Sequence, residues 1–191
     1  MPDSATVSDI IVLAMHMRPK LQLQHKMFQR QVYSDVKIPV NRCEVRDSTI
    51  HGYGVFATRV IEPDELVTLY PADLIKEHLD PKDKKKRLFA LIKTGTTEWS
   101  NGLGAYTFEV DDITSIVGDP GKCEDAAWLG HMCNDGAWLG HMCNDGGREV
   151  NARFCLLGCF VAIISLRRIE NDAEILVTYG SQYWQHREIS N

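Results

Sequence analysis

The pattern of apolar and polar positions along the chain predicts many short strands and few helices. Short strands are expected at Glu65–Tyr70, Tyr106–Val110, Ile113–Val117 and Glu174–Tyr179. Cys155–Ser165 is a nearly continuous apolar run, which is typical of a strand buried on both faces, and Arg168–Asp172 is the turn that follows it. Because strands and helices do not alternate, the pattern does not support a dinucleotide-binding fold and indicates a mainly β (α+β) chain.

Two helical segments are expected beside the strands. Ser8 and Asp9 resemble a helix start, and Pro19 either interrupts this helix or begins a second one that runs to about Val32. This segment is expected to pack on the domain, with partner binding as the alternative. Asp80 before Pro81 is typical of an N-cap, so an inserted helix is expected near residues 75–93. Its basic Lys82–Arg87 run is expected to be a solvated face, with nuclear import or substrate docking as the alternative.

Composition and charge narrow the class of protein. The chain has 191 residues, of which 44% are hydrophobic and 25% are charged, a balance typical of one globular domain with a modest appendage. Its net charge of −5 argues against direct nucleic-acid binding and suits a basic protein tail as a partner. No apolar stretch approaches the roughly 20 residues of a membrane span, no signal peptide is recognisable, and the six cysteines form no dense framework. We therefore expect an intracellular protein with reduced thiols and no membrane contact.

A ten-residue segment, AWLGHMCNDG, occurs twice in tandem, at residues 127–136 and 137–146. This period is shorter than the roughly 20–50 residues of a solenoid repeat. We expect one copy to lie in the core and the other to bulge out as a loop, the alternative being a damaged core. Each copy carries a His-x-Cys pair, and a zinc-dependent interaction protein is one reading of these pairs. Since a zinc site usually needs four ligands, no metal site is expected here.

Three further features suit ligand chemistry. Gly52 and Gly54 flank Tyr53 and leave a bare backbone whose N–H groups could hold a carboxylate, although an ordinary turn is the alternative reading. Asn144 carries an amide that can donate and accept hydrogen bonds at once. Tyr179 ends a predicted strand just before Gly180, and a core aromatic residue is the alternative reading for it.

Three separated segments together resemble the SET-domain family of protein lysine methyltransferases. Ser48–Ile61 (STIHGYGVFATRVI) resembles the family's glycine-x-glycine opening, Leu139–Ala152 (LGHMCNDGGREVNA) resembles its R-F-x-N-H-S-C-x-P-N-A stretch, and Ala173–Gly180 (AEILVTYG) resembles its G-E-E-L-x-x-x-Y-G ending. The resemblance covers about Arg42 to Trp184. It implies a SET fold of several small sheets with an inserted helix. The expected division is a helical N-terminal segment at 1–41, a SET domain at 42–184 and a tail at 185–191.

The resemblance also implies an activity: transfer of a methyl group from S-adenosylmethionine to a lysine side chain of a protein, in a histone tail or elsewhere. It assigns cofactor binding to Gly52, Tyr53, Gly54, Asn144, Asp145 and Trp184. Tyr179 is the expected catalytic residue, with its hydroxyl at the base of the lysine channel. Trp184 would cap the channel or stack on adenine, and packing against its own tail is the alternative.

The second motif departs from the family pattern. Asp145, Gly146 and Val150 replace its histidine, serine and proline, and one extra residue precedes Asn151. A carboxylate about 4 Å from the cofactor's sulfonium would attract it by about 4 kcal/mol at an effective dielectric constant of about 20. That attraction would favour the ground state over the transition state, so Asp145 is expected to point away from the sulfur, or the enzyme is slow. A SET-fold binding module without activity is therefore the alternative. No cysteine follows Cys159, so the zinc-binding post-SET module is not expected. The sequence leaves open which copy of the repeat forms the site.

Overall fold

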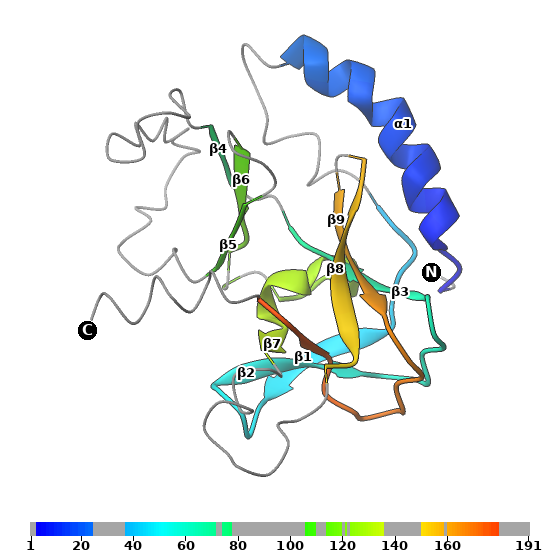
Figure 1. Ribbon diagram of the computed structural model, residues 1–191, viewed down its shortest axis with the longest axis vertical. Helices are drawn as coiled ribbons and strands as arrows, with labels where there is room; N and C mark the ends of the chain where they lie inside the picture. The colour runs from blue at the N-terminus through cyan, green and yellow to red at the C-terminus, as the bar shows by residue number, and fades with distance from the viewer. Residues whose placement is uncertain are drawn as a thin grey trace, which may run out of the picture.

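Small antiparallel sheets make up most of the fold. The computed structural model describes residues 3–24, 37–71, 74–77, 106–109, 114–119, 121, 123–135, 150–158 and 160–179. Within these residues the strands form two sheets of two strands and two of three (Figure 1). This arrangement confirms the predicted fold class of several small sheets with few helices.

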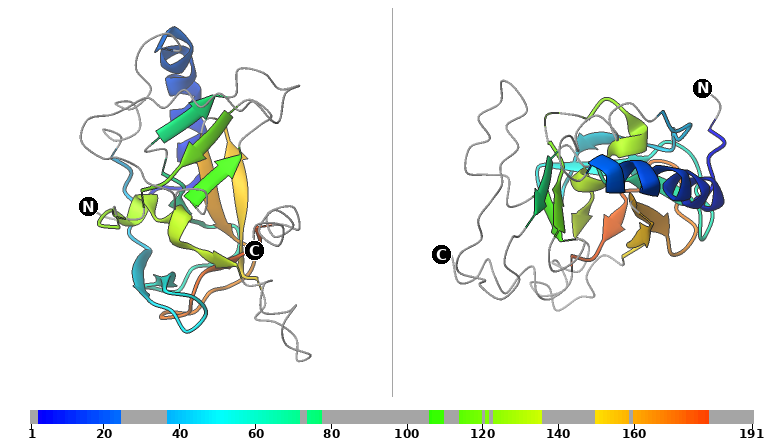
Figure 2. Two further views of the ribbon diagram at one scale, coloured as in Figure 1. Left: turned by 90° about the vertical axis from the view of Figure 1, so that its left-hand side faces the viewer. Right: turned by 90° about the horizontal axis from the view of Figure 1, so that it is seen from above.

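The elements follow one another along the chain in a mainly β order. They are α1 (Val7–Gln24), β1 (Cys43–Asp47), β2 (Tyr53–Ala57), β3 (Leu66–Leu69), β4 (Leu74–Glu77), β5 (Thr107–Glu109), β6 (Thr114–Val117), the 3₁₀ turns η2 (Ala126–Trp128) and η3 (Gly130–Met132), β7 (Asn134–Asp135), β8 (Ala152–Leu157), β9 (Phe160–Ser165) and β10 (Leu176–Val177). The sheets are β1–β2, β3–β9–β8, β4–β6–β5 and the parallel pair β7–β10. In the right-hand view of Figure 2 the β4–β6–β5 sheet lies to one side of α1 and the β3–β9–β8 sheet.

The N-terminal helix begins earlier than the sequence predicts. Thr6 caps it: its hydroxyl accepts a hydrogen bond from the Asp9 amide at 3.2 Å, and the Asp9 carboxylate accepts one from the Thr6 amide at 2.8 Å. The start predicted at Ser8 and Asp9 is therefore one to two residues late. The helix also continues past Pro19 to Gln24, so this proline neither ends the helix nor begins a second one. Within the described residues, no helix is long and apolar enough to cross a membrane.

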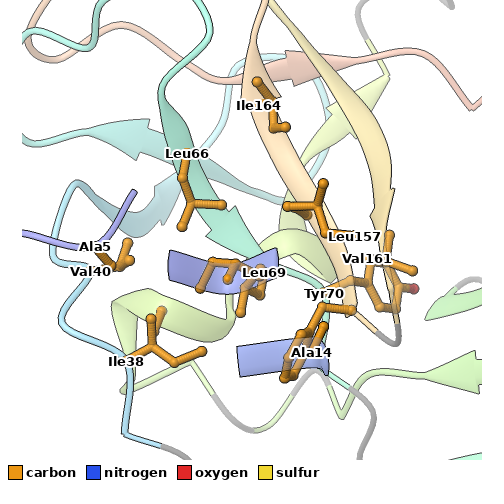
Figure 3. Packing of buried hydrophobic residues seen from close by; sticks show 14 of the residues in the cluster. Ala5, Ala14, Ile38, Val40, Leu66, Leu69, Tyr70, Leu157, Val161 and Ile164 are labelled. Carbon is orange, nitrogen blue, oxygen red and sulfur yellow. The ribbon is translucent and has the colours of Figure 1, made fainter. Parts of the chain in front are cut away.

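Two clusters of buried side chains form the core, and β9 contributes to both. Phe160 and Ile164 pack in the cluster that includes Ile10 and Ala14 of α1, whereas Ile163 packs in the cluster beneath β1 and β2. Figure 3 shows Ala14, Leu66, Leu69, Leu157, Val161 and Ile164 of the first cluster. All six residues of β9 are buried, which confirms the predicted burial on both faces for this strand.

The apolar run at Cys155–Ser165 is two strands rather than one. β8 and β9 form an antiparallel hairpin, with Leu157 paired to Phe160. Gly158 lies in the turn with a φ of +64°, a conformation that favours glycine. A Cβ atom at Gly158 would lie 2.6 Å from that of Ala14, so the turn also needs glycine to admit α1. The prediction of a single strand was wrong because it gave this glycine no weight.

Two further expectations need correction. Leu74–Glu77 forms strand β4, which pairs with β6, so the inserted helix does not begin at residue 75; residues 78–105 lie outside the described part. Within Glu174–Tyr179, only Leu176–Val177 is a strand. It pairs with β7, which is distant in the sequence, rather than returning along the strand that precedes it. Long-range pairing of this kind leaves no local pattern.

Candidate functional site

The first and third motifs meet at the side chain of Asn134. Asn134 lies on β7 opposite Leu176 of β10. Its Nδ2 donates to Oε1 of Glu174 at 2.9 Å and to the carbonyl oxygen of Tyr53 at 3.1 Å. A carboxylate and a carbonyl group only accept hydrogen bonds, so they fix the amide with its NH₂ group towards them. The Oδ1 atom of Asn134 therefore faces away from both acceptors and remains suited to a donor.

The two glycines beside Tyr53 are needed for different reasons. Gly52 has a φ of +50°, and a Cβ atom there would meet nothing within 4 Å. A Cβ atom at Gly54 would lie 2.2 Å from Oε1 of Glu174, so this glycine makes room for the carboxylate. Tyr53 between them is 61% exposed. The positive φ and the open backbone of the motif are therefore found at Gly52, whereas Gly54 is closely packed.

Glu174 joins the segments of the site, although it is not among the residues predicted from sequence. Its Oε1 atom accepts hydrogen bonds from Oγ of Ser48 at 2.7 Å and from Nδ2 of Asn134 at 2.9 Å. Its backbone carbonyl accepts a hydrogen bond from Nδ2 of Asn151 at 2.8 Å. The signal that could have found it is its place in the third motif, directly before the apolar residues Ile175–Val177.

Tyr179 lies at the end of the same arrangement. Its hydroxyl group donates to the carbonyl oxygen of Cys133, the residue before Asn134, at 2.5 Å. Its ring is half-buried and lies 6.4 Å from the ring of Phe154, which in turn lies 4.9 Å from that of Phe108. A tyrosine hydroxyl that donates one hydrogen bond can still accept others. Tyr179 is thus both anchored to the β7 segment and able to receive a donor.

The first copy of the repeat supplies the residues that meet Tyr179 and Glu174. The structure describes this copy up to Asp135. Its Gly130 packs against β3 so closely that a Cβ atom would lie 3.0 Å from the carbonyl oxygen of Leu69 and from the backbone of Tyr70. Thr68 fixes the start of the copy, since its hydroxyl donates to the carbonyl of Ala126 at 2.8 Å and accepts from the amide of Leu129 at 2.9 Å.

Three of the predicted site residues cannot be placed in this arrangement. Asn144 and Asp145 of the second copy, and Trp184 near the C-terminus, lie outside the described residues. Their roles stay predictions. Gly52, Tyr53, Gly54 and Tyr179 are described, and hydrogen bonds join Tyr53 to Asn134 and Tyr179 to the neighbouring Cys133.

The first His-x-Cys pair is packed into the protein. The Nε2 atom of His131 lies 3.1 Å from the carbonyl oxygen of Asp119. Burial, with smaller contributions from Cys43 and Glu174, raises the pKa of the Cys133 thiol well above its ordinary value of 9.0. Within the part of the chain that the structure describes, no three His, Cys, Asp or Glu side chains are grouped to hold a metal ion.

Comparison with known proteins identifies the family. A search of the curated proteins gives no match, and the solved structures include one of a Plasmodium falciparum protein provisionally described as a histone methyltransferase. The two sequences are 17% identical, and the structural alignment covers 75% of this chain and 97% of the Plasmodium protein. The TM-score is 0.43, which is a distant likeness. Residues 52–180 match the SET domain, and this range spans most of the chain and includes Gly54, Asn134, Glu174 and Tyr179. The chain therefore belongs to the SET-domain family, whose members are generally methyltransferases.

Proposed function

We propose that the protein transfers a methyl group from S-adenosylmethionine to the side chain of a lysine in a protein substrate. The observation that carries this proposal is the convergence of Asn134, the Gly52–Gly54 turn and the Tyr179 hydroxyl around the β7–β10 pair. These groups differ in chemistry and come from the beginning, middle and end of the family match.

The residues present fit the amino-acid end of S-adenosylmethionine, which carries an ammonium and a carboxylate group. The Oδ1 atom of Asn134, turned away from Glu174 and Tyr53, suits the ammonium group. The open backbone at Gly52 suits a carboxylate, and the exposed ring of Tyr53 can cover bound ligand. We assign to Asn134 the role that the sequence pattern assigns to Asn144, because Asn134 makes the contacts described above. Asp145 and Trp184 stay predicted cofactor-binding residues: Asp145 is expected to point away from the sulfur, and Trp184 to cap the channel or stack on the adenine.

Bound S-adenosylmethionine supplies an electrophilic methyl group, so the protein must present a neutral amine to it. Free lysine has a pKa near 10.4, and only about a thousandth of it is neutral at about pH 7.4. The aromatic ring of Phe154 beside Tyr179, and that of Phe108 beside Phe154, would desolvate a lysine that enters there and so lower its pKa. With its proton donated to the carbonyl of Cys133, the Tyr179 oxygen would accept an amine N–H and orient the lone pair.

A protein with an accessible lysine is the expected substrate. The net charge of −5 supports a basic tail, of a histone or of another protein. A SET-fold binding module without activity is the second candidate. It is favoured by one observation: the residue after the asparagine is an aspartate, Asp135 or Asp145, in both copies of the repeat, where the family has histidine.

Incubation with labelled S-adenosylmethionine, a panel of histones and a cell extract tests the proposal. We expect label in lysine side chains of at least one protein. Binding of the cofactor by calorimetry without any transfer would favour the binding module. Absence of both binding and transfer would contradict the two candidates together.

Replacement of Tyr179 by phenylalanine tests the mechanism. We expect turnover to fall by at least about a hundredfold, the lower end for a positioned acid–base or orienting group, with little change in the dissociation constant of the cofactor. Tyr70→Phe is the matched control, because Tyr70 also donates its hydroxyl proton to a backbone carbonyl, that of Tyr106, at 2.7 Å. Both variants should lose about 1 kcal/mol of stability with one hydrogen bond. Near-normal turnover in Tyr179→Phe would remove this residue from the mechanism.

A further inference from the structure

We infer that Glu174 is a positioning residue, whose carboxylate orients the amide of Asn134 towards the cofactor. This inference rests on the proposed function, because the orientation has a purpose only if Asn134 contacts S-adenosylmethionine. Glu174 itself would not touch the reacting atoms. It would act through Asn134.

The carboxylate is held from several sides. Its Oε1 atom accepts hydrogen bonds from Ser48 at 2.7 Å and from Asn134 at 2.9 Å, and it fills the space that the missing side chain of Gly54 leaves. The backbone around Glu174 is fixed as well: Asn151 donates to its carbonyl, and the amide of the next residue, Ile175, donates to Val55 at 2.7 Å. The carboxylate is therefore a fixed acceptor.

A fixed acceptor decides which way an asparagine amide faces. Without Glu174, the Nδ2 atom of Asn134 would keep the Tyr53 carbonyl at 3.1 Å and a longer contact of 3.4 Å to the His51 carbonyl. The bond to the carboxylate is charge-assisted, and such bonds are about twice as strong as those between neutral groups. Loss of that bond would leave only these two neutral acceptors to orient the amide, so its Oδ1 atom would face the ammonium group of the cofactor for a smaller fraction of the time.

Glu174→Gln is the sharpest variant, since it keeps the shape of the side chain and removes the charge. A glutamine can turn its NH₂ group towards Asn134, so it no longer dictates the orientation of the Asn134 amide. We expect the dissociation constant for S-adenosylmethionine, measured by calorimetry, to rise about tenfold, which matches the typical net contribution of one hydrogen bond. In the ligand-free protein, the side-chain ¹⁵N–¹H signals of Asn134, assigned by their loss in Asn134→Ala, should shift.

Glu170→Gln is the matched control. It removes the same charge four residues away, from a side chain that is 67% exposed and pairs with Arg168 on the surface. Its dissociation constant and the Asn134 signals should remain those of the wild type. A purely structural role for Glu174 predicts a lower melting temperature with an unchanged dissociation constant for S-adenosylmethionine.

Two results would overturn the inference in different ways. If the wild type binds S-adenosylmethionine and Glu174→Gln binds it equally well, or leaves the Asn134 signals in place, Glu174 does not position Asn134. If the wild type itself does not bind S-adenosylmethionine, the proposed function fails and the inference fails with it.

Discussion

Glycine at position 54 is set by a side chain that lies 120 positions later in the chain. The Cβ atom of an alanine there would lie 2.2 Å from Oε1 of Glu174 and 3.0 Å from Nδ2 of Asn134. Gly52, two residues earlier, has the opposite requirement, because its φ of +50° is unfavourable for other residues while the space around it is open. The same residue type thus serves close packing at one position and backbone conformation at the other.

Alanine at each position should separate these two roles. Gly54→Ala forces the Glu174 carboxylate out of place, so we expect a clear loss of S-adenosylmethionine binding and a destabilisation of about 1–3 kcal/mol, typical of overpacking. Gly52→Ala should cost only about 1–2 kcal/mol for a left-handed backbone conformation. Calorimetry and thermal unfolding of both variants check this. Equal cofactor binding by Gly54→Ala and the wild type would contradict the description of this contact.

At this scale the sequence predicts residues whose chemistry is local and misses those whose role depends on a distant partner. Tyr179 and the two glycines could be singled out because a motif surrounds each of them. Glu174 lies in the same motif as Tyr179, but its role could not be predicted there, since its partners Ser48 and Asn134 lie 126 and 40 residues away. The repeat also made Asn134, the partner of Glu174 on β7, hard to identify from the sequence. Asn134 and Asn144 fit the second motif equally well, and only the fold shows which contacts Asn134 makes.

At the scale of elements, the segment before α1 is tied to the domain by Arg42. This side chain is 5% exposed, pairs with Asp3 at 2.8 Å, and donates to the backbone carbonyl groups of Ala5 and Leu66. Arg59 also contacts Asp3, at 2.8 Å, and reaches Glu65 at 3.2 Å. The start of α1 is thus joined to β1 and β3 through charged groups as well as through the apolar cluster.

Removal of Arg42 should therefore cost more than removal of an exposed arginine. Arg42→Ala leaves the Asp3 carboxylate with Arg59 as its only arginine partner among the described residues and removes the Arg42 donor from two buried carbonyl groups. We expect a loss of about 3 kcal/mol. Arg168→Ala is the control, since Arg168 is 52% exposed and its pairs with Glu62 and Glu170 should contribute less than about 1 kcal/mol. Denaturant unfolding of both variants measures the difference. Similar losses of unfolding free energy in Arg42→Ala and Arg168→Ala would show that the buried hydrogen bonds of Arg42 add no stability.

Deletion of residues 137–146 tests which copy of the repeat is needed. The deletion removes one copy and leaves the sequence on both sides of the remaining one unchanged, because the copies are identical. We expect a folded protein with wild-type affinity for S-adenosylmethionine and a melting temperature at least as high. In the full chain, Asn134→Ala should weaken binding, whereas Asn144→Ala should not. The reverse pattern would place the second copy in the site.

The elements themselves were predictable where the pattern was local. The strands at β3, β5 and β6 follow from short alternating or apolar segments. The β8–β9 hairpin was missed because its apolar side chains continue across the turn, and only the φ of Gly158 marks the reversal. The parallel pairing of β7 with β10 was missed because each strand has two residues, too few for a periodic pattern.

For the molecule as a whole, stability should fall in acid through Asp3 and Glu65. Burial by itself would raise the pKa of each carboxyl group, but hydrogen bonds from Arg42 and Arg59 to Asp3, and from Arg59 to Glu65, lower both below the ordinary values of 3.8 and 4.5. A lowered pKa means that the stabilisation is complete above the ordinary value and is lost as the pH falls towards the folded-state value.

We therefore expect the melting temperature to decrease as the pH is lowered from about 5 to about 3, the range in which these carboxyl groups take up protons on unfolding. Asp3→Asn should be less stable than the wild type at neutral pH and should lose less on acidification. A pH dependence that is unchanged in Asp3→Asn would exclude Asp3 as a source of the acid sensitivity.

The tandem repeat also has a consequence for how this chain can change over generations. Residues 127–135 contact β3, Tyr179 and Glu174, and these contacts restrict which residues are acceptable there. A mutation that disrupts these contacts would disrupt the candidate cofactor site. Residues 137–146 have the same amino-acid sequence as residues 127–136. Selection can therefore tolerate amino-acid substitutions in one copy. Deletion of either copy keeps the reading frame and leaves one AWLGHMCNDG segment. Comparison of natural variants should show substitutions gathering in the second copy while the first stays constant.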